Sequence, residues 1–322
     1  MLGIDVGKST LAVCLLQGLA SGQRQELARE FPNTAAGHQA LHRWLVKQQA
    51  GPVQACMEAT GPYTLSLALF LHEQGYPVSI VNPRRIKAYA ESRLSRVKND
   101  QVDARLIAHF AVSEALPLWT PPAAERSRLR ALQARMDHLD RLIRQQRQGL
   151  ESVQEPSVRA SIERVCQVIA EEVKTVQQEV RAHLEAQDDL RAEVELLCGI
   201  PGIGRLTATR LVAAVDMARF QSADSFAAFL GLTPKEHSSG TSVRGRSRVS
   251  KVGSKSLRTA LYFPAMQACR FNPQVKALYQ RLLTAGKPKK SALCAAMRKL
   301  AHQVYGVLKS RTPYDPTLGL PA

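Results

Sequence analysis

The feature that most limits how this chain can fold is a long middle region, residues 120–219, that contains no Phe, Trp or Tyr. Apolar residues recur there at steps of three and four, first at Leu129, Leu132, Met136, Leu139 and Ile143, and then at Val158, Ile162, Val165, Ile169, Val173, Val176, Val180 and Leu184. Such spacing predicts helices with one apolar side, and Pro156 separates the two series. We therefore expect two long coiled-coil helices over residues 120–194, packed as a hairpin or against a partner chain, with their other charges solvated.

The first 119 residues have the pattern of an α/β layer structure. Short apolar runs bounded by Gly, Pro and Asn predict buried strands at LGIDVG, TLAVCLL, PVQACMEA and YPVSIV. HQALHRWLVKQQ and TLSLALFLHEQG have helical spacing, and each precedes a strand signal, which predicts helices packed on a sheet. A chain of 322 residues can form two or three cores, and we divide it into units at 1–119, 120–194 and 195–322.

Positive charge is concentrated at the C-terminal end. The chain has 44 Lys and Arg against 27 Asp and Glu, a formal charge of +17, and residues 226–322 contain 17 of the cations against only Glu236 and Asp315. This excess predicts a polyanionic partner, which could be DNA, RNA or an anionic membrane. The apolar stretch 11–16 is too short to span a bilayer and follows no basic leader, so we expect no membrane insertion and a cytoplasmic protein.

Four acidic residues are candidates for a metal site. Asp5 lies inside an apolar strand signal, Glu58 ends another, and Asp100 and Asp103 are spaced to share one face of a helix. If the fold gathers them, their repulsion calls for a cation, and hard oxygen ligands suit Mg²⁺, which can clamp a phosphodiester. Local explanations also exist, because Asp100 after Asn99 would favour a helix N-terminus. Asp5 is harder to explain locally, since a carboxylate in an apolar strand is costly to bury.

The N-terminal segment GIDVGKS has two misleading similarities. A phosphate-binding P-loop needs four residues between its first glycine and the Gly-Lys pair, and here Gly3 leaves only three. The same segment resembles the first phosphate loop of actin-like sugar kinases. A kinase also needs a second phosphate turn and an adenosine pocket, and we recognise neither in the sequence.

Two segments after residue 195 indicate contact with nucleic acid. GIPGIG is typical of a helix-hairpin-helix, in which Gly202 and Gly204 would let backbone N–H groups approach phosphate, although a plain turn between helices has the same pattern. The stretch 238–256 interleaves small residues with cations, which are Arg244, Arg246, Arg248, Lys251 and Lys255. It is predicted to follow a phosphate backbone or to display a serine nucleophile, unless it is only a disordered basic loop. Few aromatic residues lie nearby, which disfavours base stacking.

Taken together, these motifs resemble the DEDD-type insertion-sequence transposases related to the Piv DNA invertase, a family of bridge-RNA-guided serine recombinases. The resemblance extends over nearly the whole chain. It rests on GIDVGKSTLAV, MEATGPY, VNPRRIKAYAESRLSRVKNDQVDARLIA, PGIG and FLGLTPKEHSSGTSVRGRSRVSKVGSKSLRTALY.

The resemblance implies a fold and a site. An RNase H-like (RuvC-like) N-terminal domain would be followed by a coiled coil and by a mainly helical, basic C-terminal transposase domain whose serine attacks DNA. Matched motif to motif, that serine is Ser239, with Ser238 and Ser242 as alternatives. Many relatives have Asn where this chain has Ser254. The four acids implied as catalytic metal ligands are Asp5, Glu58, Asp100 and Asp103.

The resemblance also implies cofactors and partners. The metal would be Mg²⁺, for which Mn²⁺ could substitute, and the nucleic-acid partners would be donor DNA, target DNA and a structured noncoding guide RNA. A dimer or tetramer would combine domains from different protomers at one site, on the bacterial nucleoid. Two other functions fit the residues alone. One is a Holliday-junction resolvase-like nuclease that uses water in place of serine, and the other is a non-catalytic nucleic-acid-binding scaffold.

Overall fold

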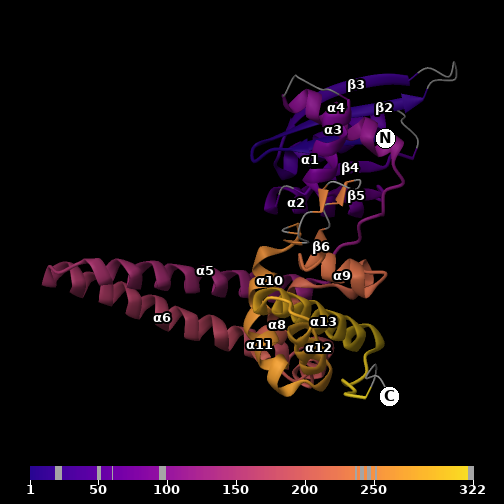
Figure 1. The fold of residues 1–322 in the computed structure, drawn as a ribbon. Helices are drawn as coiled ribbons and strands as arrows, with labels where there is room; N and C mark the ends of the chain where they lie inside the picture. Colours follow the sequence, from indigo (N-terminus) through magenta and orange to yellow (C-terminus); the bar gives the residue numbers. More distant parts are fainter. Residues whose placement is uncertain are drawn as a thin grey trace. The chain divides into compact units, whose positions relative to one another are not determined.

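The protein divides into two compact units in a computed structural model, Met1–Pro121 and Pro122–Ala322 (Figure 1). The structure describes residues 1–18, 24–48, 52–59, 61–93, 99–235, 238–239, 243–244, 248–250 and 252–317. The long middle helices therefore belong to the same unit as the C-terminal helices. A subdivision of that unit at residue 194 stays a prediction.

The first unit contains a five-stranded mixed sheet in the order β3-β2-β1-β4-β5. Its strands are β1 (Leu2–Val6), β2 (Thr10–Gly18), β3 (Arg24–Pro32), β4 (Ala55–Glu58) and β5 (Val78–Val81). β1, β2 and β3 are antiparallel neighbours, whereas β4 is parallel to both β1 and β5. The four strand signals correspond to β1, β2, β4 and β5. The edge strand β3 was not predicted because its residues are mostly exposed and polar.

Helices cover both faces of this sheet. They are α1 (Ala35–Lys47), α2 (Pro62–Glu73), α3 (Pro83–Ser92) and α4 (Asp100–Ser113). Alternate residues of a strand face opposite sides, so Leu2, Ile4 and Val6 pack with α1 and α2. The other face packs against α4, where Ala12 and Cys14 contact the helix.

The second unit is helical around one core, with two short strand pairs. Its helices are α5 (Ala124–Ser152), α6 (Pro156–Glu185), α7 (Asp188–Cys198), α8 (Arg205–Ala214), η1 (Met217–Arg219), α9 (Ala223–Phe229), α10 (Lys255–Ala260), α11 (Tyr262–Phe271), α12 (Pro273–Thr284) and α13 (Lys289–Ser310). Its strands are β6 (Pro234–Lys235), β7 (Ser238–Ser239), β8 (Val243–Arg244) and β9 (Arg248–Val249). In the part of the chain that the structure describes, no helix is long and apolar enough to cross a membrane.

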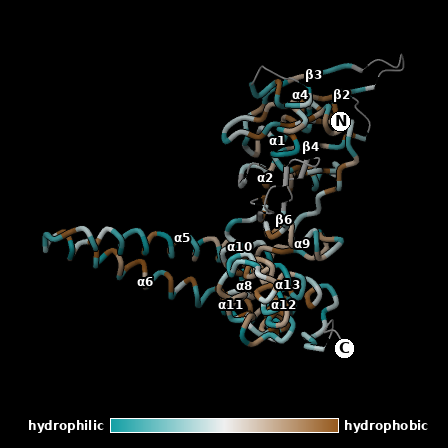
Figure 2. Tube along the Cα trace, viewed as in Figure 1, coloured by the Kyte–Doolittle hydropathy of each residue, from teal (hydrophilic) through white to brown (hydrophobic). Residues whose placement is uncertain are grey.

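The two long helices lie side by side and project from the rest of the second unit (Figure 1). The prediction of two long helices that separate near Pro156 and form a hairpin is confirmed. Figure 2 shows apolar residues along α6, and Val158, Val165 and Val168 are exposed there. Supercoiling and pairing with a second chain stay predictions.

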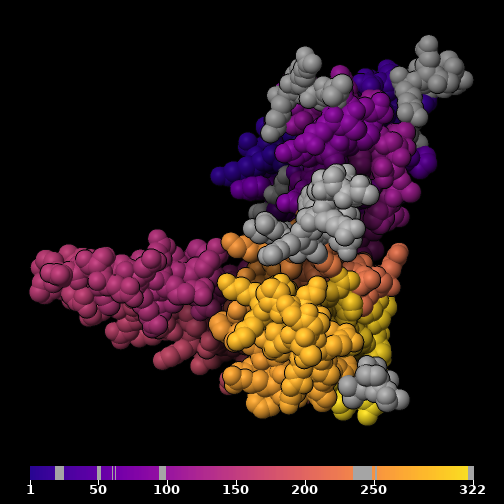
Figure 3. Space-filling model, viewed as in Figure 1, coloured from indigo at the N-terminus to yellow at the C-terminus, as the bar shows by residue number. Residues whose placement is uncertain are grey.

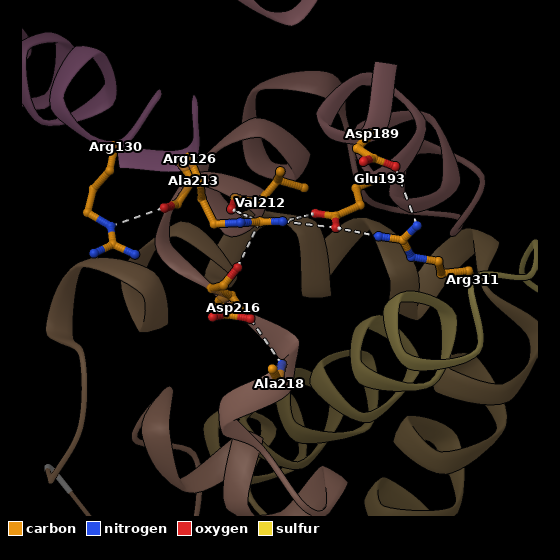
Figure 4. Close-up of polar contacts among 10 residues, drawn as sticks. Arg126, Arg130, Asp189, Glu193, Val212, Ala213, Asp216, Ala218 and Arg311 are labelled. Carbon is orange, nitrogen blue, oxygen red and sulfur yellow. Dashed lines mark hydrogen bonds and ion pairs between the residues drawn. The ribbon is translucent and has the colours of Figure 1, made fainter. Parts of the chain in front are cut away.

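A buried ion pair anchors the base of this hairpin (Figure 4). Arg126 of α5 donates through Nη1 to the carbonyl oxygens of Val212 (2.6 Å) and Val215 (2.9 Å), and through Nη2 to both carboxylate oxygens of Glu193 (2.9 Å each). It thereby caps the last turn of α8, whose carbonyls have no partner within the helix. The expectation of solvated charges was wrong for Arg126, whose side chain is only 15 % exposed, because the helix ends beside it need donors.

Candidate functional site

Two of the predicted acids lie next to one another on adjacent parallel strands. Ile4 of β1 is in register with Met57 of β4, so the following residues, Asp5 and Glu58, are neighbours at the ends of their strands. Asp5 also stands opposite Ala12 in β2, and Ala12 packs beneath α4. The two carboxyl groups therefore face the side of the sheet that α4 covers.

Helix α4 brings the other two acids to the same edge. A Cβ at Gly3 would lie 2.2 Å from the carbonyl oxygen of Ala104 and 2.3 Å from the backbone nitrogen of Ala108, so the helix crosses β1 in direct backbone contact. Asp100 and Asp103 lie in the first turn of α4, just before this crossing. The N-terminus of α4 therefore lies toward the end of β1 at which Asp5 stands.

Asn99 sets where that helix begins. Its side-chain oxygen accepts a hydrogen bond from the backbone N–H of Val102 (2.8 Å), an N-cap that satisfies one of the free donors of the first turn. The acids beside it also interact favourably with the positive end of the helix. Asp100 thus lies at a helix N-terminus, as its local sequence predicts, and it also lies near enough to Asp5 for its charge to act on that residue.

The electrostatics of Asp5 join all four acids. The pKa of Asp5 is raised to about 6, first because the carboxyl group is partly buried and then because Asp100, Asp103 and Glu58 place negative charge near it. Asp5 and Asp103 are separated by almost a hundred positions in the sequence. In the described part of the chain no three Asp, Glu, His or Cys side chains stand close enough to hold a metal ion as they lie.

Further polar residues, which no sequence pattern had indicated, make hydrogen bonds at the strand ends. The amide nitrogen of Asn33 donates to the carbonyl oxygen of Gly7 (2.9 Å) in the turn after β1. The buried His38 contacts the oxygen of the same amide through Nε2 (2.9 Å), and that nitrogen must be the donor because the amide oxygen only accepts. Burial lowers the pKa of His38, which favours its neutral form. Thr64 donates to the carbonyl oxygen of Glu58 (3.1 Å).

The two glycines of the GIPGIG turn have different surroundings. Gly202 has a positive φ of 104°, and a Cβ there would lie 2.8 Å from backbone atoms of Pro264 and Ala268 in α11. Close packing of helices thus accounts for this glycine. Gly204 has open space around it and begins α8 without a side-chain cap, so the first N–H groups of that helix have no side-chain partner among the described residues. Phosphate binding at either glycine stays a prediction.

The serine candidates lie in a segment of two-residue strands. Ser238 and Ser239 form β7, which pairs with Val243 and Arg244 of β8, and Arg248 of β9 pairs with Lys235 of β6. These positions are described by backbone alone. Ser242, Arg246 and Lys251 lie outside the described residues.

Lys255 starts α10 immediately after this segment. The hydroxyl of Ser254 accepts from the backbone N–H of Leu257 (3.3 Å) and so caps the helix. Because Asn and Ser are both strong N-cap residues, the serine found here performs the local role that asparagine would perform.

Two family models and several relatives match this chain. A family model described as "Transposase IS116/IS110/IS902 family" matches residues 194–280, and a second transposase model, of the DEDD type, matches residues 2–155. The pilin gene-inverting proteins of Moraxella bovis and Moraxella lacunata are each 31% identical over 319 residues, which cover 98% of this chain and 97% of theirs. The transposase for insertion sequence element IS1111A of Coxiella burnetii is 25% identical over 98% of this chain and 91% of its own.

Among solved structures, Thermus thermophilus RuvC aligns with 37% of this chain over its whole length, at 15% identity and a TM-score of 0.28. The two family models and the end-to-end relatives define the class, which is that of enzymes that cleave and transfer DNA strands. The chain belongs to the IS116/IS110/IS902 family of transposases.

Proposed function

We propose that this transposase cleaves and rejoins DNA with a serine nucleophile, Ser239, and a metal-binding set of four acids, Asp5, Glu58, Asp100 and Asp103. The observation that carries the proposal is geometric: Asp5 and Glu58 end adjacent strands in register, and the first turn of α4, which bears Asp100 and Asp103, lies toward the same strand end. The metal-binding role and the nucleophilic role would belong to different units, since the candidate serines lie in the second unit and the four acids in the first.

The donor set fits a hard divalent cation. Carboxylate oxygens are the ligands that Mg²⁺ prefers, and Mn²⁺ accepts the same ligands. Without a cation, the negative charges of Asp100, Asp103 and Glu58 add to burial in raising the pKa of Asp5. When bound, the metal would supply Lewis-acid stabilisation of the charge that develops on the phosphate oxygens. This chain's own contribution is to hold Asp5 and Glu58 in register and to bring Asp100 and Asp103 over them.

Ser239 would carry the covalent step. Its hydroxyl oxygen forms a bond to the phosphorus of the scissile phosphodiester, the bond from phosphorus to one deoxyribose oxygen breaks, and the proton passes to that leaving oxygen. The link between serine and DNA is still a phosphodiester, so the number of ester bonds to phosphorus does not change. A deoxyribose hydroxyl of another strand can therefore attack it and release the serine, which rejoins DNA without an external energy source.

The partners follow from charge and from exposed apolar surface. The 17 cations of residues 226–322 suit donor and target DNA and a structured guide RNA. Exposed valines on α6 suit a contact between copies of this chain, as a dimer or tetramer. Within such an assembly the acids of one protomer and the serine of another could complete one site, on the bacterial nucleoid.

A denaturing gel tests the covalent step. With labelled substrate DNA and Mg²⁺, we expect a protein–DNA adduct that survives denaturation, is absent in Ser239→Ala and persists in the neighbouring control Ser238→Ala. Cleavage without an adduct would favour a water-using nuclease. Asp5→Asn should lose cleavage and keep DNA binding, and unchanged products in that variant would contradict the metal-binding role.

A further inference from the structure

Helix α11 carries an exposed pair of aromatic rings in the second unit, among the cations of α10 and α11. Tyr262 is 42 % exposed and Phe263 is 72 % exposed, and their rings meet edge to face with centroids 5.5 Å apart. Burying an aromatic ring stabilises a folded protein, and an exposed ring does not contribute this free energy. A pair of exposed rings therefore indicates an interaction surface.

The rings belong to one continuous outer stripe. The described residues of the stripe are exposed and recur at helical spacing; they are Lys255, Ser256, Thr259, Tyr262, Phe263, Met266, Gln267 and Arg270. The opposite side of the same helices is buried, where Pro264 and Ala268 contact Gly202 of the GIPGIG turn. Packing of the inner side therefore fixes the direction in which the rings project. We call these eight residues the ring stripe.

Charge on this part of the chain indicates what the ring stripe meets. No Asp or Glu occurs between residues 237 and 314, so helices α10 to α13, which form one continuous surface in Figure 3, carry cations alone. Lys255 and Arg270 stand on either side of the rings, each roughly 10 Å away along the helix axis. Among the described residues neither of these two side chains takes part in an ion pair. An apolar partner alone would leave such cations without a counter-charge.

We propose that the ring stripe binds single-stranded DNA, with bases stacked on Phe263 and Tyr262 and phosphates paired with Lys255 and Arg270. Aromatic rings alternating with cations are what strand-binding surfaces use, since every base has a face that stacks and every nucleotide has a phosphate. From the sequence, base stacking was disfavoured because few aromatic residues lie near the basic segment. Residues 238–256 contain none, but the helix that follows places them in line with Lys255.

This inference rests on the proposed function only in taking DNA as the partner. A strand transferase must expose unpaired strands while ends are exchanged, and the ring stripe would hold such a strand. An experiment can contradict strand binding by the ring stripe without contradicting the proposed serine chemistry, and the reverse also holds. Loss of the stacking surface would not remove the adduct at Ser239, and loss of the adduct would not change strand binding without metal.

Strand binding in chelator tests the ring stripe. The probes are a fluorescent 12-nucleotide oligo-dT and the same strand with abasic residues at its centre, which keeps the phosphates and removes the stacking faces. Phe263→Leu keeps an apolar side chain and removes the ring. We expect it to weaken oligo-dT binding about fivefold or more and to leave the abasic strand unchanged. Phe271→Leu, at a ring 68 % exposed that lies about two turns further along α11 and about 80° around the helix axis from Phe263, is the matched control and should change neither.

Several results would overturn the proposal. They are an equal loss on both strands, an equal loss in Phe271→Leu, and tighter binding of oligo-U than of oligo-dT that depends on Phe263. A shift of Phe263→Leu to a smaller assembly on size exclusion would also overturn it, by assigning the ring to a contact between copies. Phe263→Trp gives a second measurement, because a stacked base should quench its indole beyond the change seen for Trp44 and Trp119 of the wild type.

Discussion

The protein contains two clusters of charged side chains that differ in how they are neutralised. Around Glu193 in the second unit, acids and guanidinium groups alternate within ion-pair distance and neutralise one another (Figure 4). Around Asp5 in the first unit, burial and then the negative charges of three other acids raise the pKa of the carboxyl group. The first arrangement is typical of a structural contact, and the second is typical of a functional site.

The largest expected effect is at the structural cluster. Glu193→Ala leaves Arg126 buried without its counter-charge, and we expect a loss of about 3–5 kcal/mol in the free energy of unfolding of the second unit. Urea denaturation followed by circular dichroism measures it. Glu195→Ala, on the exposed side of the same helix, is the control and should change the free energy by less than about 0.5 kcal/mol. Equal losses in the two variants would remove the contrast between the clusters.

The acid cluster should respond to metal. Mg²⁺ at about 100 times its dissociation constant should stabilise the first unit by about 2.7 kcal/mol near neutral pH, because it binds the folded acids and not the unfolded chain. Trp44 and Trp119 both lie in this unit, so tryptophan fluorescence during thermal unfolding reports on it selectively. Asp5→Asn should abolish the stabilisation. The same Mg²⁺ effect in that variant would separate Asp5 from the metal.

Without metal, the same residue should give a pH dependence of opposite sign from that of an ordinary paired carboxylate. The pKa of Asp5 is near 4 in an unfolded chain and about 6 when folded, so its protonated form favours folding. That contribution is complete below pH 4 and is lost as the pH rises through 6. Asp5→Asn should therefore be more stable than wild type at pH 7, by about 1–2 kcal/mol after solvent screening, and no more stable at pH 4. Denaturation in chelator at both pH values checks this, and lower stability of the variant at pH 7 would contradict it.

The smallest effect is expected at the rim of the structural cluster. Arg311 reaches Asp189 (3.4 Å) and Glu193 (3.8 Å) with a side chain that is 63 % exposed. Arg311→Ala should cost less than about 1 kcal/mol in urea denaturation, since water screens exposed pairs. A loss as large as that of Glu193→Ala would mean that Arg311, and not Arg126, neutralises the carboxylate.

The sequence predicted the strands and the helix that carry the four acids, but it did not predict how these elements pack against one another. Asp5, Glu58 and the Asp100–Asp103 step were recognisable because strand and helix periods are local properties. Gly3 lets the backbone of α4 cross β1 in direct contact. This crossing joins segments that are far apart in the sequence, so no local pattern predicts it. The hydrogen bond between Asn33 and His38 was invisible for the same reason.

In the second unit the same limit left local patterns with more than one explanation. Phosphate contact at Gly202 stays a prediction, and the close approach of α11 is a second reason for a glycine at this position. Arg126 looked like one more solvated charge on a long helix, because only the folded chain brings the end of α8 beside it. The rings of Tyr262 and Phe263 were overlooked because they follow the basic segment instead of lying within it.

The clamp that Arg126 forms on α8 has a mechanical consequence. Helix α6 has 30 residues and is about 45 Å long, so the hairpin is a lever whose short end is fixed to the C-terminal core. A tilt of about 10° at the base would sweep the tip through about 8 Å. A displacement applied at the tip would therefore reach the C-terminal core through the contact between Arg126 and the end of α8.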